Sequence, residues 1–211
     1  MAPRILSVNV GTPRTVDWHG KPIDTAIWKQ PTDGRVRLEG VNFVGDDQAD
    51  RRVHGGPDKA VYAYASEDYD WWRSQLGSVD AAAFGENLTT ADIDLGASLI
   101  GDRWQVGSAV LEVSQPRSPC FKLGIRMSDV GFPLRFTESR RPGAYLRIIE
   151  PGAIGAGDPI LVEPARPPAV VVGSLVANER SADVLELAAA DERVPPGWRR
   201  SATRELASRA R

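Results

Sequence analysis

The chemistry that this sequence can support is concentrated around its only cysteine, in the stretch SQPRSPCFKLGIR. Pro116 and Pro119 push the residues before them towards extended backbone and remove two amide donors, so we expect a stiff strand end or loop. Arg117 and Lys122 add positive charge near Cys120, which favours the thiolate, the form that attacks electrophiles and binds soft metals. The segment therefore predicts a stiffly presented thiol in positive surroundings.

Two interpretations of this cysteine stay open on the residues alone. If the extended backbone continues, Ser118, Cys120 and Lys122 lie on one face, because side chains of a strand alternate with a period of two. Most lone free cysteines, however, are small buried apolar residues without a chemical role.

A second candidate is the stretch RRVHGGPDKAVYAY. Gly55 and Gly56 leave backbone amides free to form a concave anion site, and Arg51 and Lys59 add local positive charge. The alternative is a tight turn that leads into a strand, with His54 hydrogen-bonded to a backbone carbonyl. A nucleophilic Cys/His pair is conceivable, but no protease signature surrounds the cysteine.

A third candidate is the stretch AFGENLTTADID, in which Glu86 and Asn87 follow a glycine. A buried acid or amide in such a bend could hydrogen-bond a heterocycle or donate a proton. Equally, Asn87 could be a turn residue and Glu86 a solvated charge.

Composition excludes several classes of protein. The 26 basic and 28 acidic residues create no overall field for polyanions, so we expect no nucleic-acid partner. One cysteine excludes an internal disulfide and a cysteine-only metal cluster, and fits a reducing cytoplasm. No G-x-G-x-x-G or Walker A motif is present, and no apolar run approaches the length of a membrane span. The sequence thus predicts a cytoplasmic protein without its own flavin, nicotinamide or membrane machinery.

The secondary structure that must position these residues is predicted to be mainly β. Short apolar or alternating runs, broken by turn residues, predict strands at residues 5–10, 25–28, 34–38, 60–64, 103–106, 109–114, 144–149 and 159–162. Gly107 and Ser108 predict a two-residue hairpin turn. So many short strands suggest a barrel or strongly bent sheet. The aromatic residues of YAYASEDYDWW are expected in the core and not as a base-stacking platform.

Helices are expected in two places. One begins with Ser66 as its cap and ends at Gly77, and should cover one end of the barrel. After the proline-rich spacer PARPPAV, two short helices are predicted, the first capped by Ser181. We therefore expect a barrel domain at residues 1–165 and a helical extension at residues 166–211.

Four stretches, VHGGPDKAVYAY, FGENLTT, IGDRWQVGSAVLEVSQPRSPCFKLGIR and GAYLRIIEPGAIGAGDPI, resemble MOSC-domain proteins, the family named after the C-terminal domain of molybdenum cofactor sulfurase. Their order and spacing are similar to the YiiM-like branch of stand-alone bacterial proteins, which ends in a small three-helix extension. The resemblance covers nearly the whole chain. It implies a MOSC-type β-barrel with a few peripheral helices and a C-terminal helical extension.

The resemblance also implies a cofactor, molybdenum bound to molybdopterin, with Cys120 as the thiolate ligand of the metal. The reaction also needs a residue that manages protons, and His54 is the candidate because histidine has the most suitable ordinary pKa. The contacts to the cofactor are assigned to Arg51, His54, Gly55, Gly56, Lys59, Glu86, Asn87, Arg117, Ser118 and Lys122.

The implied activity is the reduction of N-hydroxylated compounds, such as hydroxylamino-purine-type bases, to amines. Electrons must come from a separate reductase, because the chain has no recognisable electron-transfer group of its own. Two alternatives are a non-catalytic cofactor carrier or sulfur-handling module with a persulfide on Cys120, and a plain barrel scaffold with a buried cysteine. Monomer and homodimer are both compatible with the sequence.

Overall fold

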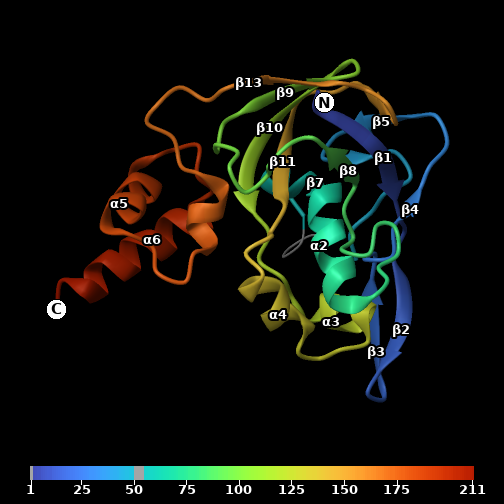
Figure 1. Cartoon of the computed structure of the whole chain (residues 1–211), viewed down its shortest axis with the longest axis horizontal. Helices are drawn as coiled ribbons and strands as arrows, with labels where there is room; N and C mark the ends of the chain where they lie inside the picture. The colour runs from blue at the N-terminus through green and yellow to red at the C-terminus, as the bar shows by residue number, and fades with distance from the viewer. Residues whose placement is uncertain (1, 50–54) are drawn as a thin grey trace.

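The computed structural model describes residues 2–49 and 55–211, and a curved eight-stranded sheet dominates it (Figure 1). The strands of this sheet are β1 (Arg4–Val10), β4 (Gln30–Pro31), β7 (Val61–Ala65), β8 (Leu88–Ala91), β9 (Arg103–Val106), β10 (Ala109–Pro116), β11 (Ala144–Glu150) and β13 (Ile160–Glu163). Their spatial order is β13-β9-β10-β11-β7-β8-β1-β4. The pair β7 and β8 is parallel, and the other neighbours are antiparallel.

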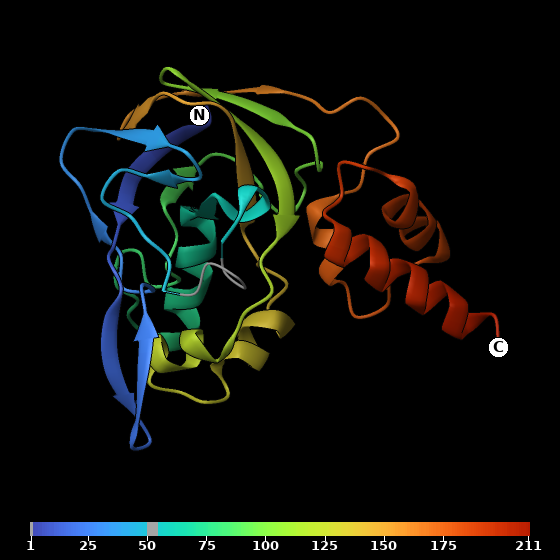
Figure 2. The same cartoon turned by 180° about the vertical axis from the view of Figure 1, so that it is seen from behind.

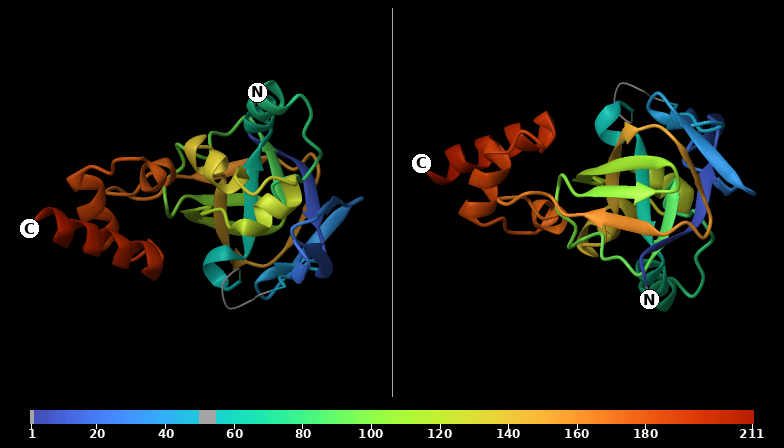
Figure 3. Two further views of the ribbon diagram at one scale, coloured as in Figure 1. Left: turned by 90° about the horizontal axis from the view of Figure 1, so that it is seen from below. Right: turned by 90° about the horizontal axis from the view of Figure 1, so that it is seen from above.

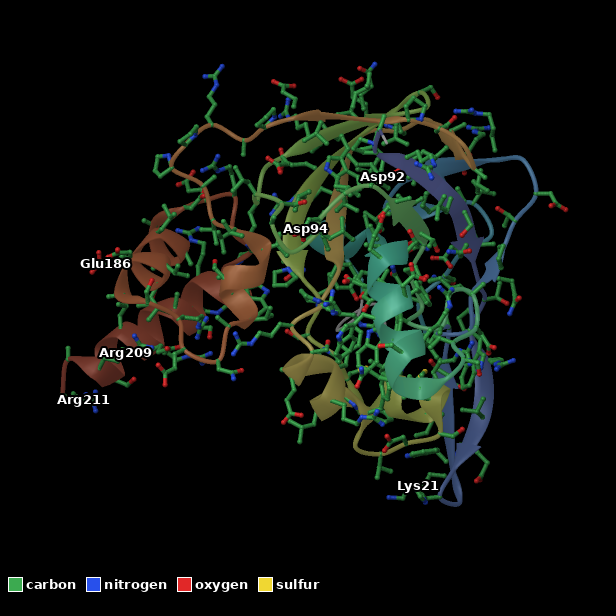
Figure 4. All side chains as sticks on the ribbon, viewed as in Figure 1. Lys21, Asp92, Asp94, Glu186, Arg209 and Arg211 are labelled. Carbon is green, nitrogen blue, oxygen red and sulfur yellow. The ribbon has the colours of Figure 1, made fainter. Side chains whose placement is uncertain are left out.

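Two smaller sheets flank the main one. They contain β2 (Arg14–Trp18) with β3 (Lys21–Thr25), and β5 (Arg35–Glu39) between β6 (Asn42–Phe43) and β12 (Ala153–Gly155). Figure 4 shows Lys21 at the outer tip of the β2–β3 hairpin and Arg209 at the opposite extremity of the molecule.

The ends of the main sheet meet near the N-terminus without forming a ladder. Ile5 N donates to Asp158 O at 2.9 Å, Ile160 N donates to Pro3 O at 2.9 Å, and one isolated bridge pairs Arg4 with Pro159. The expected β-barrel is thus present only in part. Among the described residues the fold is a strongly curved, sheet-dominant structure, and no closed barrel is shown.

Most of the expected strands are confirmed, and one is wrong. The hairpin of β9 and β10 has the expected two-residue turn, with Val106 opposite Ala109. Residues 25–28 leave the sheet after β3, because local hydrogen bonds turn the chain: Thr25 Oγ1 accepts from Ile27 N, and Ile27 O accepts from Lys29 N. Strands β2, β3, β4, β6, β8 and β12 were not expected.

The helices and 3-10 turns surround the sheet. They are η1 (Pro57–Lys59), α2 (Ser66–Leu76), α3 (Phe121–Met127), α4 (Phe132–Glu138), η2 (Val172–Val176), α5 (Ala182–Ala190) and α6 (Pro196–Arg209). None of the described helices is both long enough and apolar enough to cross a bilayer.

Helix α2 has the expected bounds but not the expected place. It packs against β7 and β8, whereas α3 and α4, which were not expected, lie at one end of the curved sheet (Figure 3). The N-cap of α2 is Ala65 and not Ser66. The aromatic residues form a buried cluster, as expected, in which Trp72 Nε1 donates to Tyr64 Oη at 2.7 Å.

The C-terminal helices lie beside the sheet (Figure 2). The cap at Ser181 is confirmed, because its hydroxyl accepts from Val184 N. Buried Leu185 and Ala202 belong to the same apolar core cluster as the strands. The division at residue 165 stays a prediction.

Candidate functional site

Cys120 lies at the junction between β10 and α3. Its backbone is extended, with φ −119° and ψ 172°, and the helix begins at the next residue, so that Leu123 N donates to Cys120 O at 2.9 Å. Because the chain turns into a helix here, the expected period-two face is wrong. Ser118 is exposed and faces a different hollow from Cys120 and Lys122, which line one pocket together.

The pocket at Cys120 gathers residues that are far apart in the sequence. Its walls come from segments 25–29 and 47–49, from Gly85 at the bend before β8, and from Tyr62 of β7 and Tyr145 of β11. Five of the expected site residues line it, namely Lys59, Asn87, Arg117, Cys120 and Lys122.

The charged side chains around this pocket are predominantly basic. Among the described lining residues, four cations stand against one carboxylate, that of Asp47. One of the cations, Lys29, is buried and pairs with Asp46, and burial lowers its pKa from the usual value. The pocket therefore suits an anionic ligand.

Arg117 is the most unusual of these cations. It is only 7% exposed, it donates to Phe84 O, and its guanidinium lies 4.8 Å from the centre of the Tyr62 ring. No carboxylate of the described residues pairs with it. Burial alone would lower the pKa of Arg117, but two tyrosine neighbours and the Cys120 thiol raise it on balance, so the buried group stays charged. A buried charge without a counter-ion is costly, and an anion bound here would offset that cost.

Asn87 lines the pocket, but its side-chain amide forms hydrogen bonds within the protein. Its Oδ1 accepts from Tyr62 N at 3.1 Å, and its Nδ2 donates to Asp46 Oδ2 at 2.8 Å and to Asn9 O at 3.3 Å. These bonds connect Asn87 to β7, to β1 and to the residue before Asp47.

Glu86 is fully buried and is not among the lining residues. Its Oε1 accepts from Tyr69 Oη at 2.5 Å and from Thr89 Oγ1 at 3.1 Å, while Oε2 has no hydrogen-bond partner. Burial raises the pKa of this carboxyl. Its expected contact with a cofactor stays a prediction.

The glycine segment is described only in part. Arg51 and His54 lie outside the described residues, so their assigned roles stay predictions. Gly56 has φ +95° at the start of η1, with open space where a Cβ would lie, and Gly55 precedes it. This left-handed backbone is one that glycine adopts readily.

Sequence reasoning did not identify most of the lining residues, among them Lys29, Tyr62 and Tyr145, as parts of a site. The only local signal was a lysine directly after the short apolar run AIW. The tyrosines lie on strands and resemble ordinary core residues.

A comparison with protein families finds the MOSC domain at residues 50–161. The chain belongs to the MOSC domain family. The matched region includes the cysteine segment, the glycine segment and the bend before β8, so the resemblance seen in the sequence is confirmed.

The relatives found are consistent with this family. The uncharacterized protein YflK of Bacillus subtilis is 42% identical over 154 residues, covering 72% of this chain and 70% of YflK. Protein YiiM of Escherichia coli is 37% identical over 145 residues, covering 67% of this chain and 64% of that protein. A Gibberella moniliformis protein named reductase is 37% identical over 146 residues, covering 67% of this chain but only 26% of its own length.

The fold is also found among solved structures. YiiM from Geobacillus stearothermophilus superposes with a TM-score of 0.78 at 27% identity, covering 97% of this chain and 99% of that one. The match therefore includes both the sheet and the C-terminal helices.

Proposed function

We propose that this MOSC-family protein binds the molybdenum–molybdopterin cofactor through Cys120 and reduces N-hydroxylated compounds to amines. The observation that carries the proposal is that Cys120 and Arg117 line the same pocket, and that Arg117 is buried without a carboxylate partner among the described residues. A MOSC-family relative named reductase supports an oxidoreductase activity.

The residues present fit such a cofactor. A thiolate is a soft ligand that suits molybdenum, and cationic side chains suit the phosphate of a pterin. When bound, the cofactor would supply two-electron oxygen-atom chemistry. In this proposal Cys120 holds the metal, Arg117, Lys59 and Lys122 hold the phosphate or the pterin, and the tyrosine rings form the walls.

Proton management is assigned to His54, because histidine titrates close to neutral pH. Gly55 and Gly56 would offer backbone donors next to it. Electrons are proposed to come from a separate reductase in the cytoplasm, since no electron-transfer motif is recognisable in the chain.

The deciding experiment measures metal, pterin and turnover in the same preparations. The protein is purified from a host that makes the cofactor, molybdenum is measured by mass spectrometry, and pterin by fluorescence after oxidation. Reduction of a hydroxylamino-purine is followed with a chemically reduced dye as electron donor. We expect molybdenum and pterin near one per chain in the wild type, with loss of both metal and turnover in Cys120→Ala.

The matched variant is Cys120→Ser, which keeps the size but replaces the soft sulfur by a harder oxygen. It should fold like the wild type and lose the metal. Metal retained at full occupancy in both variants contradicts the ligand assignment. Full metal without turnover, or a sulfur adduct on Cys120 in the mass spectrum, favours the carrier or sulfur-handling function instead.

A further inference from the structure

A second hollow lies on the other side of the segment that carries Cys120. It has a volume of about 460 Å³ and lies between the α4 end of the sheet and the C-terminal helices. We call it the arginine groove, after the four arginines that line it: Arg117, Arg140, Arg141 and Arg180.

The groove carries more positive than negative charge. Glu205 is the only carboxylate among its described lining residues. It pairs with Arg180, and Arg141 pairs with Asp68 outside the groove. The side chain of Arg140 is exposed and has no ion pair with a described residue, and Arg117 has no carboxylate partner. Two of the four guanidinium groups are thus without a counter-ion in the described structure.

Two of the arginines also have unused donors. Arg141 Nε and Arg180 Nη1 are buried and have no hydrogen-bond acceptor. Buried N–H groups without acceptors are uncommon in proteins, and both of these belong to arginines that line the basic hollow. A phosphate group offers several acceptor oxygens to guanidinium groups, which can bind it in a bidentate manner.

The remaining walls suit an organic body attached to such a phosphate. Phe136 and Trp198 line the groove together with prolines and aliphatic residues. The ring of Trp198 is fixed, because its Nε1 donates to Gln115 Oε1 at 2.9 Å. The volume lies in the range of small-molecule sites.

We propose that the arginine groove binds a small organic phosphate of the nucleoside monophosphate class, with its phosphate on the arginines and its base against the aromatic wall. The groove shares Arg117 with the cysteine pocket and is otherwise lined by different residues. The proposal does not depend on the reaction proposed for that pocket.

The test is calorimetric titration of the full-length protein with AMP, adenosine and inorganic phosphate, after its cofactor content has been measured. We expect AMP to bind more tightly than adenosine. Arg140→Ala should weaken AMP binding about tenfold, the loss expected for one charge-assisted contact. Because both Arg and Ala carry a Cβ, the strain of the positive φ of 55° at this position is unchanged.

Two control variants locate the binding. Arg135→Ala also removes one arginine charge, but at an exposed position of α4 that does not line the groove. This variant should bind AMP like the wild type. Lys122→Ala changes the cysteine pocket and should also leave AMP binding intact. The proposal is overturned if millimolar AMP does not bind, if adenosine binds as tightly as AMP, or if Lys122→Ala weakens binding while Arg140→Ala does not.

Discussion

At the scale of single residues, Arg117 connects the features of the site. It follows β10 directly and is buried against Tyr62 and Phe136. Three residues, Ser118, Pro119 and Cys120, separate it from the start of α3. A buried arginine without a carboxylate partner contributes little to stability, because its desolvation is not repaid by an ion pair. Its place is better explained by an anionic ligand than by the fold.

We therefore expect Arg117→Met to fold and to lose the cofactor. Methionine fills a similar volume, and removing an uncompensated charge offsets the lost hydrogen bond to Phe84 O, so the free energy of unfolding should change by no more than about 1–2 kcal/mol. Chemical denaturation measures the stability, and pterin fluorescence measures the cofactor. Arg117→Lys is the control, since it keeps the charge and should retain part of the pterin; equal pterin in all three proteins would contradict the assignment.

At the scale of elements, a buried carboxyl connects α2 to the start of β8. Glu86 accepts from Tyr69 of α2 and from Thr89 of β8, in an interior that penalises its charged form. Because its pKa is raised in the folded state above the usual value of 4.5, the folded protein binds this proton more tightly than the unfolded chain. The resulting stabilisation is present below pH 4.5 and is lost as pH rises through the folded pKa.

Glu86→Gln should therefore be more stable than the wild type, by a margin that grows from pH 5 to pH 8. Glutamine resembles the protonated acid and still offers an oxygen to Tyr69, so the gain in the free energy of unfolding should be larger at the higher pH. Thermal unfolding followed by circular dichroism at both pH values tests this. Glu138→Gln, at an exposed position of α4, is the control and should show no such trend. A margin that stays constant with pH would refute the explanation.

At the scale of the whole molecule, the sheet and the C-terminal helices share one core. Leu185 of α5 and Ala202 of α6 are fully buried in the same cluster as the strand residues. Polar contacts add to this: Arg147 of β11 donates to Arg193 O at 2.7 Å, and Trp198 of α6 donates to Gln115 of β10. Such a shared core favours unfolding as one unit.

We expect full-length protein to unfold in a single calorimetric transition, with calorimetric and van't Hoff enthalpies in agreement. Trp198→Phe removes the bond to Gln115 and should lower the temperature of that single transition. Two separated transitions, or a variant that moves only one part of the curve, would show that residues 166–211 fold independently.

Local signals predicted much of the fold. A hairpin turn at Gly107 and Ser108 requires backbone that glycine adopts readily, and Ser181 caps its helix through its own hydroxyl. Helix α3 was missed because the two prolines before it indicate extended chain, whereas burial of Leu123 against the aromatic cluster favours a helix immediately after Cys120. Tertiary packing here overrides the local pattern.

The site could be predicted only where its residues sit close together in the sequence. Cys120, Arg117 and Lys122 come from one segment, and their shared positive surroundings were visible. The contribution of Lys29 depends on its burial beside Asp46, and that of Tyr145 on the pairing of β11 with β7 and β10, which are long-range contacts. The separation of Ser118 from Cys120 likewise follows from the turn into α3.

Arg117 lines both the cysteine pocket and the arginine groove, so a single guanidinium faces two binding places. Ligands that share one charge are thermodynamically linked: if the first changes the affinity for the second by some factor, the second changes the affinity for the first by the same factor. If both anions bind the Arg117 guanidinium at once, each lowers the affinity for the other. If the first ligand only holds the Arg117 side chain in the conformation that the second needs, it raises the affinity for the second. The sign of that coupling, measured in either direction, would report how the charge is divided between the two sides of the segment.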